Sequence, residues 1–341
     1  METTKLQNIA QALVARSKGI LAADESDRTI KKRFDGIGVE STIDNRRSYR
    51  EMLFTTPGIE AFLSGVILFD ETFRQSSQAG IPFYKLLADK GILPGIKVDK
   101  GTVPLPDSPD ETITAGLDGL SERLAEYYNL GAKFAKWRAV ITIKDDKLPT
   151  LAALEANADI MAQYASFCQG AGVVPIVEPE VLLDGNHSLE RCAAVSEATL
   201  AALFSKLQEH KVYLPDILLK TSMVLPGKEF GDKAAPEKIA AATLSCFRKV
   251  IPNDLPGIVF LSGGQGPVEA TANLQAINSA GQGVPWQLSY SFARALQGEA
   301  LEAWKGQAAN LPRAQKIFYH RAQCVSAARD GQYSPAMENS L

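Results

Sequence analysis

The residues Asp216-Ile217-Leu218-Leu219-Lys220-Thr221 form a short apolar run that ends in a lysine. A continuous apolar run of this length is typical of a strand that is buried on both faces, as in a parallel sheet covered by helices. Successive side chains of a strand point to opposite faces, so Lys220 is expected to share a face with Leu218. The stretch therefore predicts a buried parallel strand with a lysine near its carboxyl end.

The same pattern, an apolar run closed by a polar residue, recurs along the chain. It predicts strands at 19–24, 65–70, 95–99, 133–139, 173–178, 216–220, 257–261 and 286–289. Segments with apolar residues at helical spacing separate them, for example at 121–129, 151–170, 189–210, 236–250 and 268–280. Eight such alternations without a linker favour an α/β fold with a single closed (β/α)8 TIM barrel domain over residues 1–341. An open doubly wound sheet is less favoured, because no Gly-x-Gly-x-x-Gly fingerprint opens the first unit.

Three segments lie outside the repeat. An amphipathic helix is expected within residues 1–16, and a loop rich in proline and aspartate at 100–110. A further helix is predicted at residues 311–329. The polar segment from residue 330 to residue 341 is not expected to have fixed structure, and residues 331–341 are predicted to be a mobile tail. Tyr333 is expected to anchor this segment by packing its ring, and not to enter catalysis.

Composition limits the possible partners of the chain. The hydrophobic content of 45% and charged content of 22% are typical of a globular protein without a membrane-spanning segment. A net charge of −3 and the lack of a basic tail argue against nucleic acid as a partner. The four cysteines are scattered, which fits a reducing cytoplasm, and the three histidines lack the spacing of a metal site. A histidine-rich metal site is therefore not expected.

Charged residues close several of the predicted strands. In a (β/α)8 barrel the active site lies at the carboxyl ends of the strands, so these side chains should meet. A strand-end lysine alone more often reaches solvent through its stem, but a set of buried charges is rare unless the charges are paired or functional. The set consists of Asp24, Lys97, Lys136, Arg138, Glu178, Glu180 and Lys220.

This set suits Schiff-base chemistry. Desolvation and positive neighbours lower the pKa of a buried lysine, and a neutral lysine amine can attack a carbonyl group. A carboxylic acid can then dehydrate the carbinolamine, and a carboxylate can move protons. The surplus of positive charge predicts an anionic substrate. Ser262-Gly263-Gly264-Gln265 after the seventh strand is a candidate phosphate cradle, which Arg294 can close with a bidentate contact.

Several motifs resemble those of the class I fructose-1,6-bisphosphate aldolases, in the order of that family. They are Leu21-Ala22-Ala23-Asp24-Glu25-Ser26, Gly95-Ile96-Lys97-Val98-Asp99-Lys100-Gly101, Lys136-Trp137-Arg138, Val177-Glu178-Pro179-Glu180, Leu261-Ser262-Gly263-Gly264-Gln265 and Arg294-Ala295-Leu296-Gln297. The resemblance implies a carbon–carbon lyase of glycolysis and gluconeogenesis that needs no cofactor. It also implies a cytoplasmic homo-oligomer, with a tetramer favoured, that acts on small sugar phosphates.

The resemblance also assigns roles to residues. It implies that Lys220 forms the Schiff base and that Glu178 is the acid and base of carbinolamine chemistry, with Asp24, Lys136 and Glu180 beside it. It implies that the C1 phosphate is held by Ser262, Gly263 and Arg294. The open-chain sugar and the C6 phosphate would be served by Lys97, Arg138, Arg33 and Thr29.

The sequence departs from the family at two places, and two alternatives stay open. Lys220-Thr221-Ser222-Met223 replaces the common Lys-Pro-Asn-Met, and the chain ends in Leu341 where many members have a tyrosine. The alternatives are another Schiff-base barrel of the transaldolase kind, whose substrate carries one phosphate, and a sugar-phosphate binder without catalysis. The two basic clusters argue for two phosphates, and the intact charged set argues for catalysis.

Overall fold

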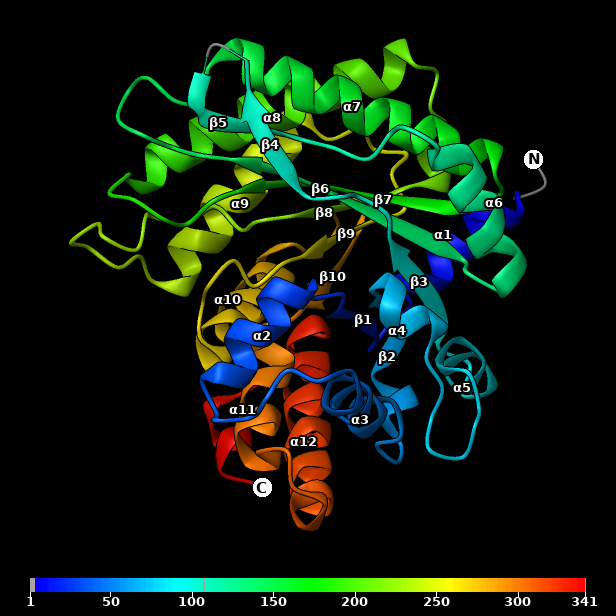
Figure 1. Cartoon of the computed structure of the whole chain (residues 1–341). Coiled ribbons are helices and arrows are strands. Elements are labelled where there is room, and N and C mark those ends of the chain that lie inside the picture. The colour runs from blue at the N-terminus through cyan, green and yellow to red at the C-terminus, as the bar shows by residue number, and fades with distance from the viewer. Residues whose placement is uncertain (1–3, 107, 341) are drawn as a thin grey trace.

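The computed structural model describes residues 4–106 and 108–340, and eight parallel strands within them close into a barrel (Figure 1). Around the barrel the order of the strands is β1-β10-β9-β8-β7-β6-β3-β2. Their bounds are Gly19–Ala23 (β1), Leu63–Leu68 (β2), Leu93–Lys97 (β3), Phe134–Ile141 (β6), Val174–Val181 (β7), Leu218–Thr221 (β8), Gly257–Phe260 (β9) and Gln287–Phe292 (β10). The predicted (β/α)8 barrel is confirmed, and every predicted strand overlaps an observed one.

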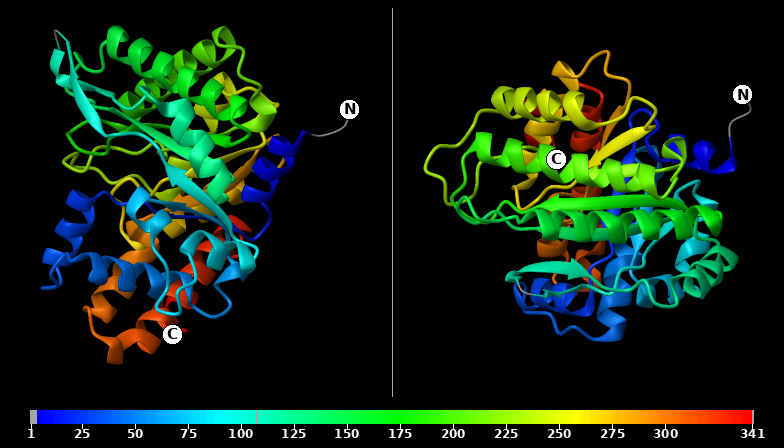
Figure 2. Two further views of the ribbon diagram at one scale, coloured as in Figure 1. Left: turned by 45° about the vertical axis from the view of Figure 1, so that its right-hand side comes forward. Right: turned by 90° about the horizontal axis from the view of Figure 1, so that it is seen from above.

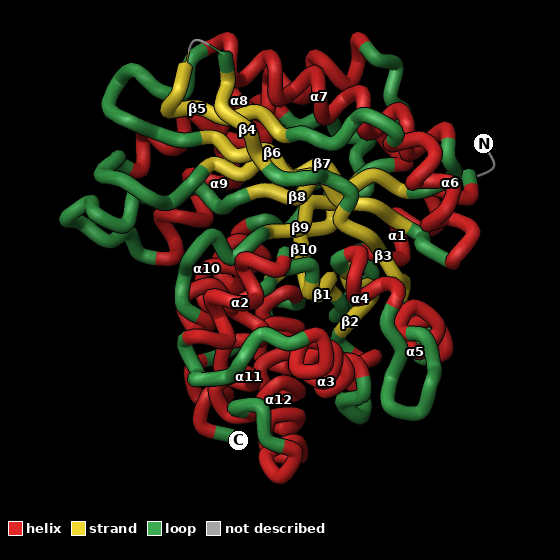
Figure 3. Tube along the Cα trace, in the orientation of Figure 1, coloured by secondary structure: helices red, strands yellow, loops and turns green. Residues whose placement is uncertain are grey.

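Helices surround the barrel, as the tube in Figure 3 shows. The longer ones are α1 (Lys5–Leu13), α2 (Asp27–Asp35), α3 (Ile43–Phe54), α6 (Leu120–Leu130), α7 (Leu151–Gly170), α8 (Leu189–Glu209), α9 (Pro236–Val250), α10 (Pro267–Ala280), α11 (Arg294–Trp304) and α12 (Leu311–Arg329). Two short helices, α4 (Asp70–Arg74) and α5 (Phe83–Asp89), lie between β2 and β3. Short 3-10 turns are found at Ile59–Ala61, Leu214–Asp216, Ala308–Asn310 and Pro335–Asn339. Over the described residues, no helix is both long and apolar enough to cross a membrane.

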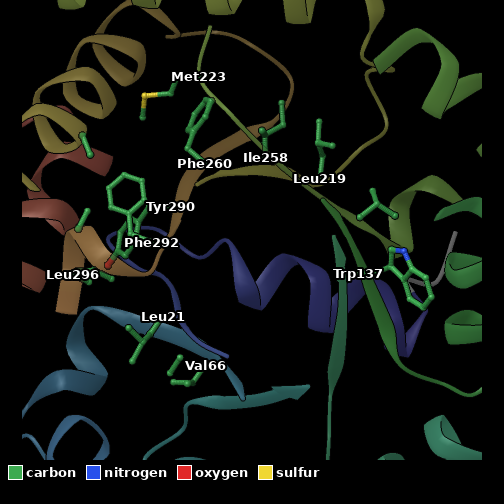
Figure 4. Packing of buried hydrophobic residues seen from close by; sticks show 14 of the residues in the cluster. Leu21, Val66, Trp137, Leu219, Met223, Ile258, Phe260, Tyr290, Phe292 and Leu296 are labelled. Atoms are coloured by element: carbon green, nitrogen blue, oxygen red, sulfur yellow. The ribbon is translucent and has the colours of Figure 1, made fainter. Parts of the chain in front are cut away.

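A large apolar core fills the layer between the strands and the outer helices. Strand residues that point outward, such as Trp137, Leu219 and Phe260, are fully buried in this layer (Figure 4). The indole ring of Trp137 packs against the Tyr164 ring of α7, with 5.4 Å between the ring centroids. Because the outward side chains of the strands are held this firmly, the inward side chains of the same strands are held as well.

A second, smaller apolar cluster lies inside the barrel. It joins Leu13 and Val14, at the end of α1, to inward strand residues that include Phe134, Ile176 and Leu218. In all views α1 lies on the other side of the barrel from the β4–β5 hairpin, which consists of Thr102–Leu105 and Ser108–Thr114 (Figures 1 and 2). The first helix therefore closes one end of the barrel with apolar side chains.

Two glycines leave the space that this inner cluster needs. A Cβ on Gly95 would lie 2.3 Å from the ring of Phe134, and one on Gly65 would lie 2.7 Å from Leu13. Real Cβ atoms do not approach other heavy atoms this closely, so larger side chains at these positions would displace the cluster. The packing of the inner cluster therefore requires glycine at positions 65 and 95.

The loop predicted at 100–110 is wrong at residues 102–105 and 108–110, which form strands of the β4–β5 hairpin. Residues 100, 101 and 106 lie outside the strands, and residue 107 lies outside the described residues. Proline and aspartate suggested a loop, but both are tolerated on the edge of a two-stranded sheet. The hairpin is anchored by the buried carboxylate of Glu111, which accepts hydrogen bonds from the Thr150 backbone at 2.8 Å and the Thr150 hydroxyl at 2.7 Å. This contact ties the hairpin to the start of α7.

The C-terminal helix α12 has the predicted bounds, but the segment after it is more ordered than expected. Residues 335–339 form a 3-10 turn, so the expectation of no fixed structure is wrong there, and the mobility of 331–341 stays a prediction; residue 341 lies outside the described part. Glu338 pairs with the buried Arg321 of α12 and accepts a hydrogen bond from the Tyr333 hydroxyl at 2.8 Å. Tyr333 is buried against the barrel layer, as an anchor would be.

This anchor predicts the effect of removing the Tyr333 hydroxyl. Tyr333→Phe should lower the free energy of unfolding by about 1 kcal/mol, because the carboxylate of Glu338 loses a hydrogen bond. Urea titrations measure this, with Tyr213→Phe as the control because Tyr213 is half exposed. Deletion of residues 334–341 should leave the cleavage and the C3 proton exchange that the resemblance implies within a few fold of the full chain. Loss of proton exchange with intact cleavage would instead show that the segment is catalytic.

Candidate active site

The predicted catalytic side chains meet inside the barrel at the carboxyl ends of neighbouring strands. Cα pairing between β7 and β8 places Ile176 opposite Leu218, so Glu178 and Lys220 follow side by side. Pairing between β3 and β6 places Lys97 opposite Lys136. These residues point inward because they lie an even number of positions from apolar residues of the inner cluster, such as Leu218 for Lys220.

A chain of buried ionic contacts joins four of the predicted residues. Lys220 Nζ lies 3.1 Å from Oε1 of Glu178, and the other carboxylate oxygen of Glu178 lies 3.1 Å from Nζ of Lys136. Lys136 Nζ in turn lies 2.8 Å from Oδ2 of Asp24. The side chains of Lys136, Glu178 and Lys220 are each no more than 5% exposed. The positive neighbour that was expected for Lys220 is present, and it reaches Lys220 through the shared carboxylate.

The lysines in this row of ionic contacts keep the carboxylates of Asp24 and Glu178 ionised. Burial favours the neutral acid, but the ammonium groups of Lys136 and Lys220 outweigh it and hold the pKa of Asp24 well below its usual range. For the same reasons, with Arg138 adding to the effect, the pKa of Glu178 is lowered. Burial also opposes the charge of Lys136, yet the carboxylates of Asp24 and Glu178 raise its pKa above the usual range. The resting site therefore holds carboxylates, and a carboxylic acid arises only after a proton transfer.

Asp99 is a member of this cluster that was not among the predicted site residues. Its buried carboxylate pairs with Lys97 and lies 4.0 Å from Nζ of Lys136, and it also accepts a hydrogen bond from the Arg138 backbone at 3.3 Å. The missed signal was its place at the end of a predicted strand, two residues beyond Lys97. With Asp99, three carboxylates balance the three lysines at positions 97, 136 and 220.

Arg138 and Glu180 were also predicted to belong to the site, and they form a pair of their own. The guanidinium group of Arg138 donates a hydrogen bond to Glu180, and the interaction raises the pKa of Arg138 despite the cost of burial. Both side chains line the same cavity as Lys220. Glu180 is thus placed to orient Arg138, and its ionic partner is Arg138 and not Lys220.

The predicted phosphate cradle follows β9 and precedes α10. Gly263 and Gly264 have φ values of +55° and +92°, a conformation that favours glycine. Arg294, at the start of α11, donates a hydrogen bond from Nη2 to the Gly264 carbonyl at 3.0 Å. Ser291 at the end of β10 is a second missed residue: its buried hydroxyl lines the cavity without a hydrogen-bond partner among the described residues.

The remaining predicted residues, Arg33 and Thr29, lie on α2 and line the cavity. Arg33 pairs with the buried carboxylate of Glu25, which also binds the fully buried Arg50. Burial would raise the pKa of Glu25, but Arg33 and Arg50 together lower it. Thr29 is exposed, and its hydroxyl lies 3.2 Å from that of Ser26. Lys97 at the end of β3 and Arg138 in β6 line the same cavity.

All of the predicted site residues line one cavity of about 1120 Å³. Its described walls carry nine lysines and arginines and six aspartates and glutamates, so the expectation of a net positive site is confirmed. Within the described residues, no group of three or more His, Cys, Asp and Glu side chains is arranged to hold a metal ion. The prediction that the reaction needs no metal rests on lysine chemistry and stays a prediction.

The family model for class I fructose-bisphosphate aldolase matches residues 5–341 of the chain. The chain belongs to the class I fructose-bisphosphate aldolase family. It is 52% identical over 334 residues to a probable fructose-bisphosphate aldolase class 1 of Xanthomonas campestris, covering 98% of this chain and 99% of that protein. Human fructose-bisphosphate aldolase C is 49% identical over 336 residues, which cover 98% of this chain and 92% of the human one.

A solved structure of a family member has nearly the same fold. Fructose-bisphosphate aldolase from Plasmodium falciparum, crystallised with TRAP and a small-molecule inhibitor, superposes with a TM-score of 0.95 at 48% identity. The match covers 96% of this chain and 95% of that one. In the present chain, unlike in the common family pattern, Thr221 and Ser222 replace Pro-Asn after Lys220, and both residues are buried. Thr221 ends β8, and the Ser222 hydroxyl donates a hydrogen bond to the Val181 carbonyl at 2.9 Å. The substitution thus keeps β8 tied to β7 next to Lys220.

The central place of Lys136 leads to a prediction about pH and stability. Lys136→Met removes the ammonium group that Asp24 and Glu178 share, so the pKa of each carboxyl group should rise. A carboxyl group with a lowered pKa stabilises the fold above its unfolded-state pKa, and this contribution is lost as the pH falls through the folded-state value. The variant should therefore be less stable by about 3–5 kcal/mol at pH 7, the usual cost of breaking a buried ion pair.

Urea titrations between pH 4 and pH 8 test this prediction. The loss caused by Lys136→Met should shrink as the pH falls, because the carboxyl groups that it leaves unpaired become neutral. Lys249→Met is the matched control, because Lys249 pairs with Glu197 at 2.6 Å while its side chain is 58% exposed, and such a pair contributes about 0–1 kcal/mol. Equal losses in both variants would contradict the role given to Lys136.

Proposed function

We propose that this aldolase catalyses the reversible cleavage of fructose 1,6-bisphosphate into dihydroxyacetone phosphate and glyceraldehyde 3-phosphate, with Lys220 as the Schiff-base nucleophile. The observation that carries the proposal is the buried contact of 3.1 Å between Lys220 Nζ and Glu178 Oε1 at the strand ends. An amine in direct contact with a carboxylate can lose a proton to it and become a nucleophile without help from water.

The first steps of the proposed reaction use this contact. Lys220 gives a proton to Glu178, and the neutral amine attacks C2 of the open-chain ketose to form a carbinolamine. Glu178, now a carboxylic acid, protonates the carbinolamine hydroxyl, which leaves as water. The product is a protonated iminium on Lys220 and a carboxylate on Glu178, so the charges of the resting pair are restored. Glu178 is thus acid and base in turn, although it rests as a carboxylate.

Cleavage of the C3–C4 bond then needs a base for the C4 hydroxyl proton. Glu178 is again ionised at this point and lies beside the iminium nitrogen, so it is placed to accept the proton. The electron pair of the broken bond moves into the iminium to give an enamine, and glyceraldehyde 3-phosphate leaves. Return of the proton to C3 and hydrolysis of the iminium release dihydroxyacetone phosphate. Asp24 is a weaker base because its pKa is held well below the usual range.

Two basic groups in the cavity support a substrate with two phosphates. The first is the cradle of Ser262, Gly263 and Gly264 with Arg294, which we assign to the C1 phosphate. The second consists of Lys97, Arg138 and Arg33 with Thr29, which we assign to the open-chain hydroxyls and the C6 phosphate. A transaldolase-like substrate with one phosphate would leave one of these groups without an anion.

We also infer that the aldolase is a cytoplasmic homo-oligomer, with a tetramer favoured by the family resemblance. Exposed aromatic side chains support an interface between copies: Tyr128, Phe167 and Tyr213 are each at least 39% exposed. Two of them share one neighbourhood, since Gln169, two residues after Phe167, is hydrogen-bonded to the Tyr213 backbone. Sedimentation in dilute buffer measures the oligomeric state.

The nucleophile can be identified by reductive trapping. Borohydride added with dihydroxyacetone phosphate should inactivate the enzyme and leave the three-carbon label on the peptide that carries Lys220, because reduction of the iminium joins the label to the lysine through a stable amine. Mass spectrometry of the digest locates the label, and Lys220→Met should remain unlabelled. A label on Lys97 or Lys136 would show that the assignment is wrong.

The role of Glu178 can be tested by removing its ability to gain and lose a proton. Glu178→Gln keeps the shape of the side chain, and carbinolamine dehydration should slow by about 10² to 10⁴ fold, the usual contribution of one general acid or base. Stopped-flow measurement of iminium formation gives this rate separately from substrate binding, which should change little. Glu180→Gln is the control, because Glu180 pairs with Arg138. A larger loss in the control would make Glu180 the better candidate.

A further inference from the structure

A lysine that is not part of the predicted set lies next to the phosphate cradle. Lys228 is in the segment between β8 and α9, and its Nζ lies 2.8 Å from the point that a Cβ on Gly264 would occupy. Arg294 Nη2 lies 3.7 Å from the same point. Two cations, one from the segment between β8 and α9 and one from the start of α11, therefore converge on one glycine of the cradle.

The backbone that carries Lys228 is fixed independently of its side chain. Three hydrogen bonds join this segment to the one between β7 and α8: Gly227 N to His187 O at 2.8 Å, Lys228 N to Leu183 O at 2.9 Å and Glu229 N to Gly185 O at 3.1 Å. The two segments pack so closely that a Cβ on Gly227 would lie 2.1 Å from the Gly185 carbonyl oxygen. Replacement of the Lys228 side chain should therefore leave the segment in place.

The present partner of Lys228 holds it only weakly. Lys228 Nζ lies 2.8 Å from Oδ1 of Asp184, but the two side chains are 45% and 69% exposed. An exposed pair of this kind contributes little to stability, because water competes with each partner. A phosphate dianion in the cradle carries more negative charge than Asp184 and offers several acceptor oxygens.

We propose that Lys228 is a substrate-binding residue of this aldolase: it leaves Asp184 to bind the phosphate in the Gly263-Gly264 cradle, together with Arg294. The proposal rests on the function proposed above, and it makes Asp184 a competitor of the substrate phosphate. Lys228 then acts on ligands that carry the C1 phosphate, such as dihydroxyacetone phosphate and fructose 1-phosphate. It does not act on glyceraldehyde 3-phosphate, whose phosphate comes from C6.

The proposal predicts effects of opposite sign for the two partners. Lys228→Gln should raise the KM for fructose 1-phosphate and for dihydroxyacetone phosphate by about threefold to tenfold, the effect of one partly exposed charged hydrogen bond. Asp184→Asn should lower both by about twofold, because it frees Lys228. The double variant should behave as Lys228→Gln alone, and the KM for glyceraldehyde 3-phosphate should stay the same in each.

Steady-state kinetics in both directions measure these constants, with Lys249→Gln as the control because Lys249 forms an exposed pair with Glu197 and does not line the cavity. If the ion pair between Lys228 and Asp184 only ties the loops together, both single variants should shift KM in the same direction. That result would overturn the proposal, as would an equal change in the KM for glyceraldehyde 3-phosphate.

A measurement without turnover separates this proposal from the proposed function. The wild-type enzyme and both variants are titrated with inorganic phosphate in a calorimeter. Compared with the wild type, Lys228→Gln should bind phosphate more weakly and Asp184→Asn should bind it more tightly. This contrast supports the role of Lys228 even if fructose 1,6-bisphosphate is not cleaved. Phosphate binding that is the same in all variants would show that Lys228 does not face the cradle.

Discussion

The site depends on the buried ammonium group of Lys136, which lies between the carboxylates of Asp24 and Glu178. Each of these ions would be costly to bury alone, and their mutual contacts, 2.8 Å and 3.1 Å long, make the ionised forms stable inside the barrel. Lys136 comes from β6, Asp24 follows β1 and Glu178 comes from β7, so the contact holds only if the whole barrel closes. The orientation of Glu178 toward Lys220 therefore follows from the fold and not from local sequence.

The barrel keeps this polar layer at one end because the other end is filled with apolar side chains. Leu13 and Val14 enter from α1, and Phe134 fills the space left by Gly65 and Gly95. In β6, Phe134 and Lys136 are two residues apart and share the inward face, so the strand passes from the dry layer to the charged layer within one repeat of its pleat. Lys220 stands above Leu218 in the same way. The low-dielectric floor strengthens the ionic contacts directly above it.

The sequence predicted the barrel and most of its site because both depend on short, repeated patterns. Each strand shows as an apolar run, and each charged residue at its end is visible without knowledge of its partners. The pairings between strands were not predictable: Glu180 binds Arg138, and Asp99 lies near Lys136, because both contacts depend on how neighbouring strands are aligned. The hairpin at 102–114 was missed because its prolines suggested a loop, and Lys228 was missed because only the folded loops bring it to Gly264.

The same arrangement explains how one carboxyl group can serve several proton transfers. When Lys220 becomes a neutral amine or carbinolamine, Glu178 loses one of the two ammonium groups that lower its pKa, so it is a stronger base at the moment when it must hold a proton. When the iminium forms, the positive charge returns to the same nitrogen, and Glu178 again favours its ionised form. Lys136 stays charged throughout, because Asp24 and Asp99 remain beside it. The constant charge at Lys136 thus limits how far the pKa of Glu178 moves, and the changing charge at Lys220 sets the time at which it moves.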